Sequence, residues 1–157
     1  MAYQKLQVSR ALVVIPSDTV DIPFPGALMI SSTTTGASAL KLIDSAGDFI
    51  NKGVKVGDIV YSGTTIAATV TAVDSATELS VSTAVPTTTA YKLYKAGANE
   101  GCVLYVGTGG NLEVITAGGD TVLYTGVPTG MFMPVQVKRV VGVASGATTA
   151  ATIVAQW

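Results

Sequence analysis

The residue types that most often carry enzyme chemistry are scarce in this chain. It has no histidine and one cysteine, Cys102, among 157 residues. Histidine is the usual general base and the commonest protein ligand for metals. One thiol without histidine supplies neither an internal disulfide nor a structural zinc site. Cys102 follows a glycine at the start of an expected strand, so we interpret it as a buried core thiol and not as a nucleophile.

The acidic residues are the remaining candidates for catalysis. Glycine or serine stands beside Asp44, Asp48, Asp58, Asp74 and Asp120. In turns, aspartate accepts hydrogen bonds from nearby backbone amides, and turn chemistry is the favoured interpretation. A pair of carboxylates brought together in space, as in glycan hydrolases, is the enzymatic alternative. We expect no catalytic, cofactor-binding or metal-binding residues and a protein that is not an enzyme.

One glycine-rich segment has the composition of a phosphate-binding loop. Gly107-Thr108-Gly109-Gly110 would need a following helix whose amides bind the anion. A strand is expected there instead. The segment therefore predicts the turn of a hairpin that joins a strand at Cys102 to Val106 with a strand at Leu112 to Thr116.

The charge balance and the short apolar runs argue against two classes of partner. Nine Lys plus Arg against ten Asp plus Glu give a net charge of −1, and the basic residues are scattered. A nucleic-acid binder needs a concentrated basic surface. The longest apolar runs, such as Ala11 to Ile15, are far shorter than the roughly 20 residues that cross a bilayer. We expect neither a nucleic-acid partner nor a membrane partner.

The positions of β-forming and turn-forming residues predict an all-β fold. Valine and threonine are abundant, seventeen glycines punctuate the chain, and apolar stripes with a helical period are missing. Expected strands include Ala27 to Ser32, Ile66 to Val73 and a long strand from Met131 to Val143, in which Pro134 marks an edge or a bulge. We predict a β-sandwich or barrel-like body that carries a small barrel-like module.

The composition changes near Leu40 and again after Tyr94. Between these points, strands of five to eight residues alternate with short turns, which is typical of a small barrel. We predict a discontinuous main body of residues 1–40 and 98–157, with an inserted module of residues 41–97.

Three segments in order resemble a known class of protein. They are Val14-Ile15-Pro16-Ser17-Asp18-Thr19-Val20-Asp21-Ile22-Pro23; Gly101-Cys102-Val103-Leu104-Tyr105-Val106-Gly107-Thr108-Gly109-Gly110-Asn111-Leu112-Glu113-Val114; and Met133-Pro134-Val135-Gln136-Val137-Lys138-Arg139-Val140, continuing to the terminal segment from Thr148 to Trp157. This order is similar to that of small virion structural proteins of tailed bacteriophages, of the capsid decoration or cement type. The segment from Val54 to Tyr94 resembles a barrel-like insertion of such proteins.

The resemblance implies a function, a location and partners. It implies a non-enzymatic protein that binds the outer surface of a phage capsid and stabilises the shell, with the major capsid protein as partner. It also implies self-association, with a homotrimer favoured, and a place on the virion after synthesis in the host bacterial cytoplasm. A single unpaired cysteine fits that reducing compartment. The alternatives are a phage tail, fibre-base or host-adhesion module, and a β-domain with another binding function.

Two short segments are the predicted interface. Ile22, Pro23, Phe24 and Pro25 form an arm whose two prolines prevent regular strand pairing, so we expect the arm to contact a neighbour. Lys138 and Arg139 are the densest basic pair, and Arg139 is the favoured contact because guanidinium binds a carboxylate with two donors. We expect Trp157 to pack into the body.

Overall fold

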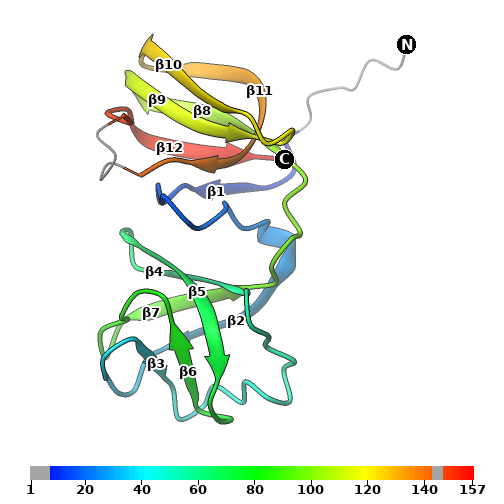
Figure 1. Ribbon diagram of the computed structural model, residues 1–157, viewed down its shortest axis with the longest axis vertical. Coiled ribbons are helices and arrows are strands. Elements are labelled where there is room, and N and C mark those ends of the chain that lie inside the picture. The colour runs from blue at the N-terminus through cyan, green and yellow to red at the C-terminus, as the bar shows by residue number, and fades with distance from the viewer. Residues whose placement is uncertain (1–7, 143–146) are drawn as a thin grey trace.

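The all-β prediction is confirmed. A computed structural model of the chain describes residues 8–142 and 147–157, and its regular elements there are strands apart from one 3-10 helix, η1 (Pro25–Ala27) (Figure 1). The strands form two six-stranded antiparallel sheets that pack on one another in a sandwich arrangement. The order in the first sheet is β1 (Ala11–Val13), β12 (Ala151–Gln156), β8 (Cys102–Thr108), β11 (Met131–Val140), β9 (Gly110–Thr116) and β10 (Thr121–Val127). The order in the second is β2 (Leu28–Thr33), β7 (Ala90–Tyr94), β4 (Ile59–Ser62), β5 (Ile66–Val73), β6 (Glu78–Val81) and β3 (Lys41–Ile43).

The boundary predicted at residue 40 does not coincide with the division of the strands between the two sheets. β2 lies in the predicted main body by sequence, yet it pairs with β7 in the second sheet, from Leu28 opposite Tyr94 to Thr33 opposite Ala90. The second sheet therefore takes its strands from Leu28 to Tyr94, and the first takes its strands from both sides of that segment. The division into independently folding units stays a prediction, and residues 1–7 of the predicted body lie outside the described residues.

Neither strand ladder closes into a barrel. In the described part of the chain, β1 and β10 border the first sheet, and β2 and β3 border the second. One isolated bridge, between Gly36 and Ile43, connects the loop after β2 with β3. The second sheet is thus a strongly curled open sheet.

Strand β11 has the irregularity predicted from its proline. It pairs regularly with β8 from Met131 to Met133, and its register shifts before Val137. A proline removes an amide donor from the ladder and so disrupts regular pairing. Pro134 lies inside the shifted stretch. The last residue of the predicted strand, Val143, lies outside the described residues.

The predicted hairpin between β8 and β9 is wrong, because β11 lies between these two strands. The chain instead turns a corner at Gly109 and continues into β9. A Cβ atom on Gly109 would lie 2.5 Å from the carbonyl oxygen of Val127, and one on Gly110 would lie 2.8 Å from the amide nitrogen of Ala150. The glycines are thus required by the close approach of three backbone segments.

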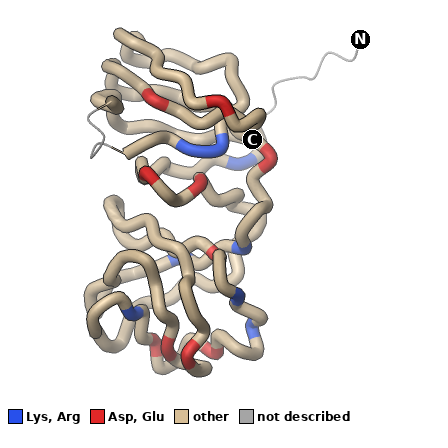
Figure 2. Tube along the Cα trace, in the orientation of Figure 1, with Lys and Arg blue, Asp and Glu red and all other residues tan. Residues whose placement is uncertain are grey.

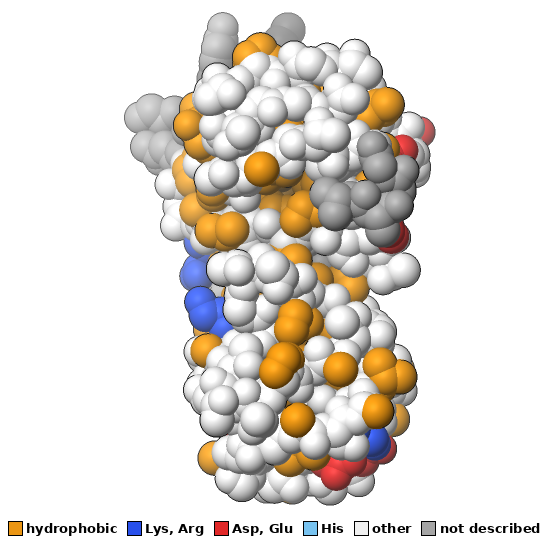
Figure 3. Space-filling view, turned by 90° about the vertical axis from the view of Figure 1, so that its left-hand side faces the viewer, with side chains coloured by type: hydrophobic (Ala, Val, Ile, Leu, Met, Phe, Trp, Pro, Cys, Tyr) orange, Lys and Arg blue, Asp and Glu red, His pale blue; other side chains and the backbone are white. Residues whose placement is uncertain are grey.

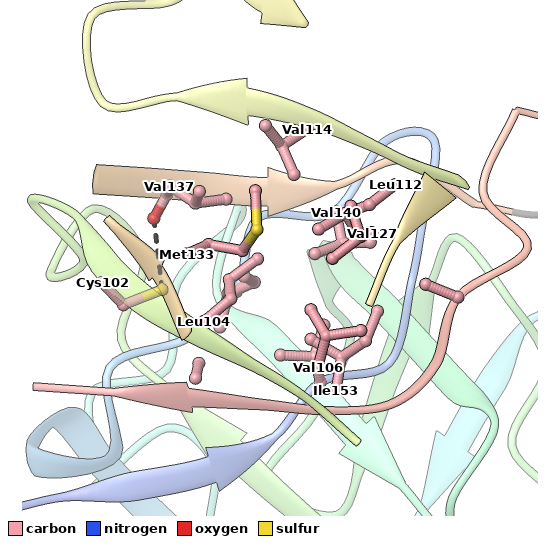
Figure 4. Close-up of a cluster of buried hydrophobic side chains, with 14 residues drawn as sticks. Cys102, Leu104, Val106, Leu112, Val114, Val127, Met133, Val137, Val140 and Ile153 are labelled. Atoms are coloured by element: carbon pink, nitrogen blue, oxygen red, sulfur yellow. Dashed lines mark hydrogen bonds between the residues drawn. The ribbon is translucent and has the colours of Figure 1, made fainter. Parts of the chain in front are cut away.

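The first core lies inside the curled first sheet. Figure 4 shows side chains from β8, β9, β11 and β12 pointing toward one another, among them Leu104, Leu112 and Ile153. Cys102 belongs to this cluster and donates a hydrogen bond from Sγ to the carbonyl oxygen of Val137 at 3.2 Å. Burial raises the pKa of its thiol to about 12. Its predicted burial is confirmed.

The second core contains a buried carboxylate. Phe49, Leu79 and Tyr91 are part of the apolar cluster of the second sheet, and Asp44 beside it is only 1% exposed. The Tyr91 hydroxyl donates to Asp44 Oδ2 at 2.7 Å, and the amide of Ala46 donates to Oδ1 at 2.9 Å. Burial by itself would raise the pKa of Asp44, but hydrogen bonds from Ser32, Ala46 and Tyr91 outweigh it and lower the pKa.

The Asp44→Asn variant should be less stable than the native chain by about 1–2 kcal/mol at pH 7, because one charged hydrogen-bond acceptor is lost. Since the pKa of Asp44 is lower in the folded state, its stabilisation is present above the ordinary aspartate range and is lost as the pH falls through the folded value. The difference between variant and native chain should therefore shrink below about pH 4. Urea unfolding at pH 7 and pH 3 measures it. Asp48→Asn, on an exposed turn, is the control, and a difference for Asp44→Asn that does not change with pH would contradict the assignment.

Candidate interaction surface

The predicted arm lies between the two sheets and is mostly internal. Ile22 is 1% exposed and belongs to the first core, and Pro23 is also buried. The amide of Ile22 donates to the carbonyl oxygen of Lys138 at 2.8 Å, and its carbonyl accepts from Asn99 Nδ2 at 2.9 Å. Surface in this segment is therefore contributed by Phe24 and Pro25, which are half-buried.

Phe24 packs against the chain terminus. Its ring meets the ring of Trp157 edge-on, with centroids 5.6 Å apart and planes at 70°. The guanidinium carbon of Arg10 lies 5.8 Å from the centroid of the Phe24 ring. Trp157 itself packs against the first core, as predicted. Phe24 thus joins the arm to Arg10 before β1 and to Trp157 after β12, two residues that pair with one another at one edge of the first sheet.

Phe24→Ser should lower the free energy of unfolding by about 2 kcal/mol, because a half-buried ring and its edge-on contact with Trp157 are lost. Thermal unfolding followed by circular dichroism measures the loss. The control is Ile50→Ser, which removes an apolar side chain that is 60% exposed and should leave the melting temperature nearly unchanged. An equal effect of the two substitutions would show that Phe24 contributes no packing.

Arg139 already has carboxylate and carbonyl partners in its own chain. Its Nε and Nη2 lie 2.8 Å and 2.7 Å from Asp21 Oδ1, and its Nη1 donates to the carbonyl oxygen of Asp18 at 2.9 Å. The guanidinium therefore fastens the loop after β1 to β11. Lys138 is half-buried and holds Ile22 through its backbone carbonyl. The structure brings Lys138 and Arg139 close to Ile22, but through contacts internal to the chain.

An apolar row crosses the outer face of the first sheet. Val13 on β1 opposes Val154 on β12, Val154 opposes Tyr105 on β8, and Tyr105 opposes Phe132 on β11. Directly opposed residues share a face of a sheet, so these four side chains lie side by side. The rings of Tyr105 and Phe132 have centroids 5.0 Å apart. We name Val13, Val154, Tyr105 and Phe132 the outer row.

The outer row is exposed at both of its ends. Val13 is 61% exposed and Phe132 is 53% exposed, whereas Val154 and Tyr105 are half-buried. On the same sheet, the neighbouring residues Leu12, Ala155 and Leu104 face the cores. Figure 3 shows hydrophobic side chains exposed at many places along one side of the molecule. Contiguous apolar surface of this kind is typical of a protein interaction site.

Sequence reasoning missed the outer row because its members are far apart in the chain. Around these positions, each strand has apolar residues on both of its faces, so the sequence pattern does not identify which face is exposed to solvent. The row becomes visible only with the registers of β1, β12, β8 and β11. The nearest signal in the sequence was the aromatic content of the predicted strands.

Asn99 is a second residue that sequence reasoning missed. It is 8% exposed and lies in the segment that returns from β7 to β8. Its Nδ2 donates to the carbonyl of Ile22, and its Oδ1 accepts from the amide of Gly101 at 2.9 Å and from the indole Nε1 of Trp157 at 3.2 Å. One side chain thus joins the arm, the return segment and the C-terminal strand.

The described residues hold no group of three or more acidic or cysteine side chains placed to bind a metal. Acidic residues gather at the end of the second sheet that is farthest from the first (Figure 2). There Lys41 forms ion pairs with Asp74 at 3.0 Å and with Glu78 at 3.2 Å. Within residues 8–142 and 147–157, the structure has no helix with the length and hydropathy needed to span a membrane.

Comparison of the chain with protein-family models, with curated proteins and with solved structures found no match. The fold and the outer row are therefore the observations on which a function must be argued.

Proposed function

We propose that the protein is a non-enzymatic structural component of a bacteriophage virion that binds the outer surface of the capsid and stabilises the shell. The major capsid protein is the partner, and a homotrimer is the favoured assembly. The resemblance of the three sequence segments to decoration proteins motivates this proposal.

The observation that carries the proposal is the outer row. A protein that reinforces a shell needs a rigid body and an apolar surface that a neighbour can cover. The outer row supplies such a surface, since it extends over four adjacent strands of one sheet. Because these strands are held in a continuous ladder, the surface needs little ordering when it binds, which favours affinity.

Capsid occupancy tests the role of the outer row. Phe132→Ser should reduce the number of copies bound per capsid by at least about tenfold if the ring is a central contact worth more than about 1.4 kcal/mol. Ile50→Ser is the matched control, because Ile50 is an exposed apolar residue in the second module. Equal occupancy of the two variants would remove the outer row from the capsid contact.

Labelling electron microscopy of purified particles tests the location. Uniform label over the capsid is the expected result. Label confined to the tail, to fibre bases or to one vertex would overturn the decoration role in favour of the tail or adhesion alternative. Light scattering tests the trimer, since a species of only 15.9 kDa at all concentrations would leave assembly to the capsid.

A further inference from the structure

A crevice separates the edge of the first sheet from the outer face of the second. Its volume is about 480 Å³, and its lining includes Ala11 and Val13 of β1 on one side. On the other side lie Ser31 of β2, Lys92 of β7 and Tyr61 of β4. Ser31 and Tyr61 each lie directly opposite Lys92 across the ladder, so the three residues share one face.

The wall formed by β1 is a free strand edge. In the described part of the chain, β1 has a neighbouring strand on one side only, which is β12. Arg10 and Val14 direct their amides to β12, where they donate to the carbonyls of Trp157 and Ile153. Because backbone groups alternate in direction along a strand, Ala11 and Val13 direct their N–H and C=O groups away from β12.

The residues of this edge strand carry none of the chemical protection against pairing, and its shortness, three residues, is the protection that it has. Natural edge strands often carry a lysine, a proline or a bulge that prevents another strand from adding. β1 consists of alanine, leucine and valine, and its pairing with β12 is regular over all three residues. An extended chain is the partner that matches an unpaired row of donors and acceptors.

The opposite wall supplies a charge preference. Lys92 is exposed and is the one residue with a formal charge among those that line the crevice. Among the described residues, the ion pairs involve Lys41 and Arg139 and leave Lys92 without a carboxylate partner. A ligand with a carboxylate would therefore be favoured over one with an ammonium group.

We propose that the crevice binds an extended peptide segment of another protein, which adds as a strand to the free edge of β1 and places an acidic side chain near Lys92. Alternate side chains of the added strand face the wall of the second sheet, where Ser31 and Lys92 are exposed and Tyr61 is 6% exposed, because side chains of a strand alternate between two sides. Val13 belongs both to this edge and to the outer row, so the two surfaces are continuous. The proposal does not depend on the capsid assignment, since it concerns a site on the isolated protein.

A titration of the full chain with synthetic peptides tests the site. The probe is a hexapeptide of alternating valine and threonine in which one threonine is replaced by glutamate. One control peptide carries lysine in place of the glutamate, and a second carries N-methyl groups on the amides of one edge. Amide chemical shifts and hydrogen exchange of Ala11 and Val13 report on strand addition, and the Lys92→Glu variant reverses the charge of the opposite wall.

The expected result has three parts. The acidic peptide shifts the amides of Ala11 and Val13 and slows their exchange, whereas the N-methylated peptide does neither. The native chain prefers the acidic peptide over the lysine peptide by about threefold, as expected for an exposed ion pair. Lys92→Glu, shown to be folded by an unchanged melting temperature, reverses this preference.

Three results would overturn the proposal. The first is no change at Ala11 and Val13 with any of the peptides at millimolar concentration. The second is binding that N-methylation leaves unaltered, which would identify a site for apolar molecules and not for strands. The third is protection of Ala11 and Val13 that grows with protein concentration alone, which would identify a second copy of the chain as the occupant.

Discussion

A chain from which residues 28–94 are excised, with Ala27 joined to Lys95 through a Gly-Ser link, should still unfold cooperatively. The amide of Lys95 donates to the carbonyl oxygen of Ala27 at 3.0 Å, so the two new ends are already adjacent. All six strands of the first sheet are kept, together with the first core. The excised chain should therefore retain the hydrogen-bond ladder and the apolar cluster that stabilise this sheet.

The excision also removes the packing between the two sheets. Ile15 and Val20, beside the first sheet, form a small cluster with Ile59, Tyr61 and Tyr94 of the second. Exposure of Ile15 and Val20 should lower the free energy of unfolding by about 3–6 kcal/mol, at about 1.5–3 kcal/mol for each side chain. Scanning calorimetry should show one transition at a lower temperature than in the full chain.

Excision of residues 41–97 is the informative comparison. These are the boundaries that the sequence alone suggested, and they leave β2 in the chain while removing β7, its partner. An isolated strand with unpaired backbone groups favours aggregation. We expect this second excision to abolish a reversible transition. Two excised chains that unfold equally well would show that the pairing of β2 and β7 does not define the unit.

The sequence predicts local structure well where the signal is local. β2 begins and ends within one residue of the predicted strand Ala27 to Ser32, and β5 coincides with the predicted Ile66 to Val73. The irregularity around Pro134 follows from the chemistry of proline itself. In each of these cases, neighbouring residues determine the backbone conformation.

The errors concern which strands are neighbours. The glycines before β9 predict a reversal of the chain, but they serve a corner at which β11 is inserted between β8 and β9. Likewise, the change in composition near Leu40 predicts a domain boundary there. The strand before it, β2, nevertheless pairs with β7, and the paired residues are about sixty positions apart in the chain. Alternation of side chains identifies a strand without identifying its partners.

The same limit explains why the predicted interface residues became internal. Arg139 is predicted to bind a carboxylate of a partner, since guanidinium geometry favours this contact, and that interface contact stays a prediction. The nearest carboxylate is Asp21 of the same chain, which is far away in sequence. Phe24 likewise packs against a residue that is distant in the sequence, Trp157. The outer row is the exposed apolar surface, and its identification requires the registers of four strands.

The Asn99→Ala variant should lower the free energy of unfolding by about 3 kcal/mol, which for a domain of this size corresponds to a melting temperature about 10 °C lower. The substitution removes a hydrogen-bond partner from three groups: the carbonyl of Ile22, the amide of Gly101 and the indole N–H of Trp157. Buried polar groups that lose their partners cost about 1–3 kcal/mol each. Chemical denaturation at pH 7 measures the loss.

The Asn99→Asp variant separates the donor of Asn99 from its acceptor. Aspartate keeps an oxygen for Gly101 and Trp157, but as a carboxylate it presents a second oxygen to the carbonyl of Ile22, where Asn99 Nδ2 donates at 2.9 Å. Burial and this repulsion should raise the pKa of the introduced carboxyl group in the folded state.

A carboxyl group with a raised pKa destabilises the fold above its unfolded pKa. Protonation at lower pH relieves the effect, because the protonated acid can donate to the carbonyl of Ile22. The stability of Asn99→Asp relative to the native chain should thus improve as the pH falls from 7 to about 4, whereas that of Asn99→Ala should stay constant. Parallel pH profiles for the two variants would show that the hydrogen bond to Ile22 contributes nothing to the junction of the arm, the return segment and the C-terminal strand.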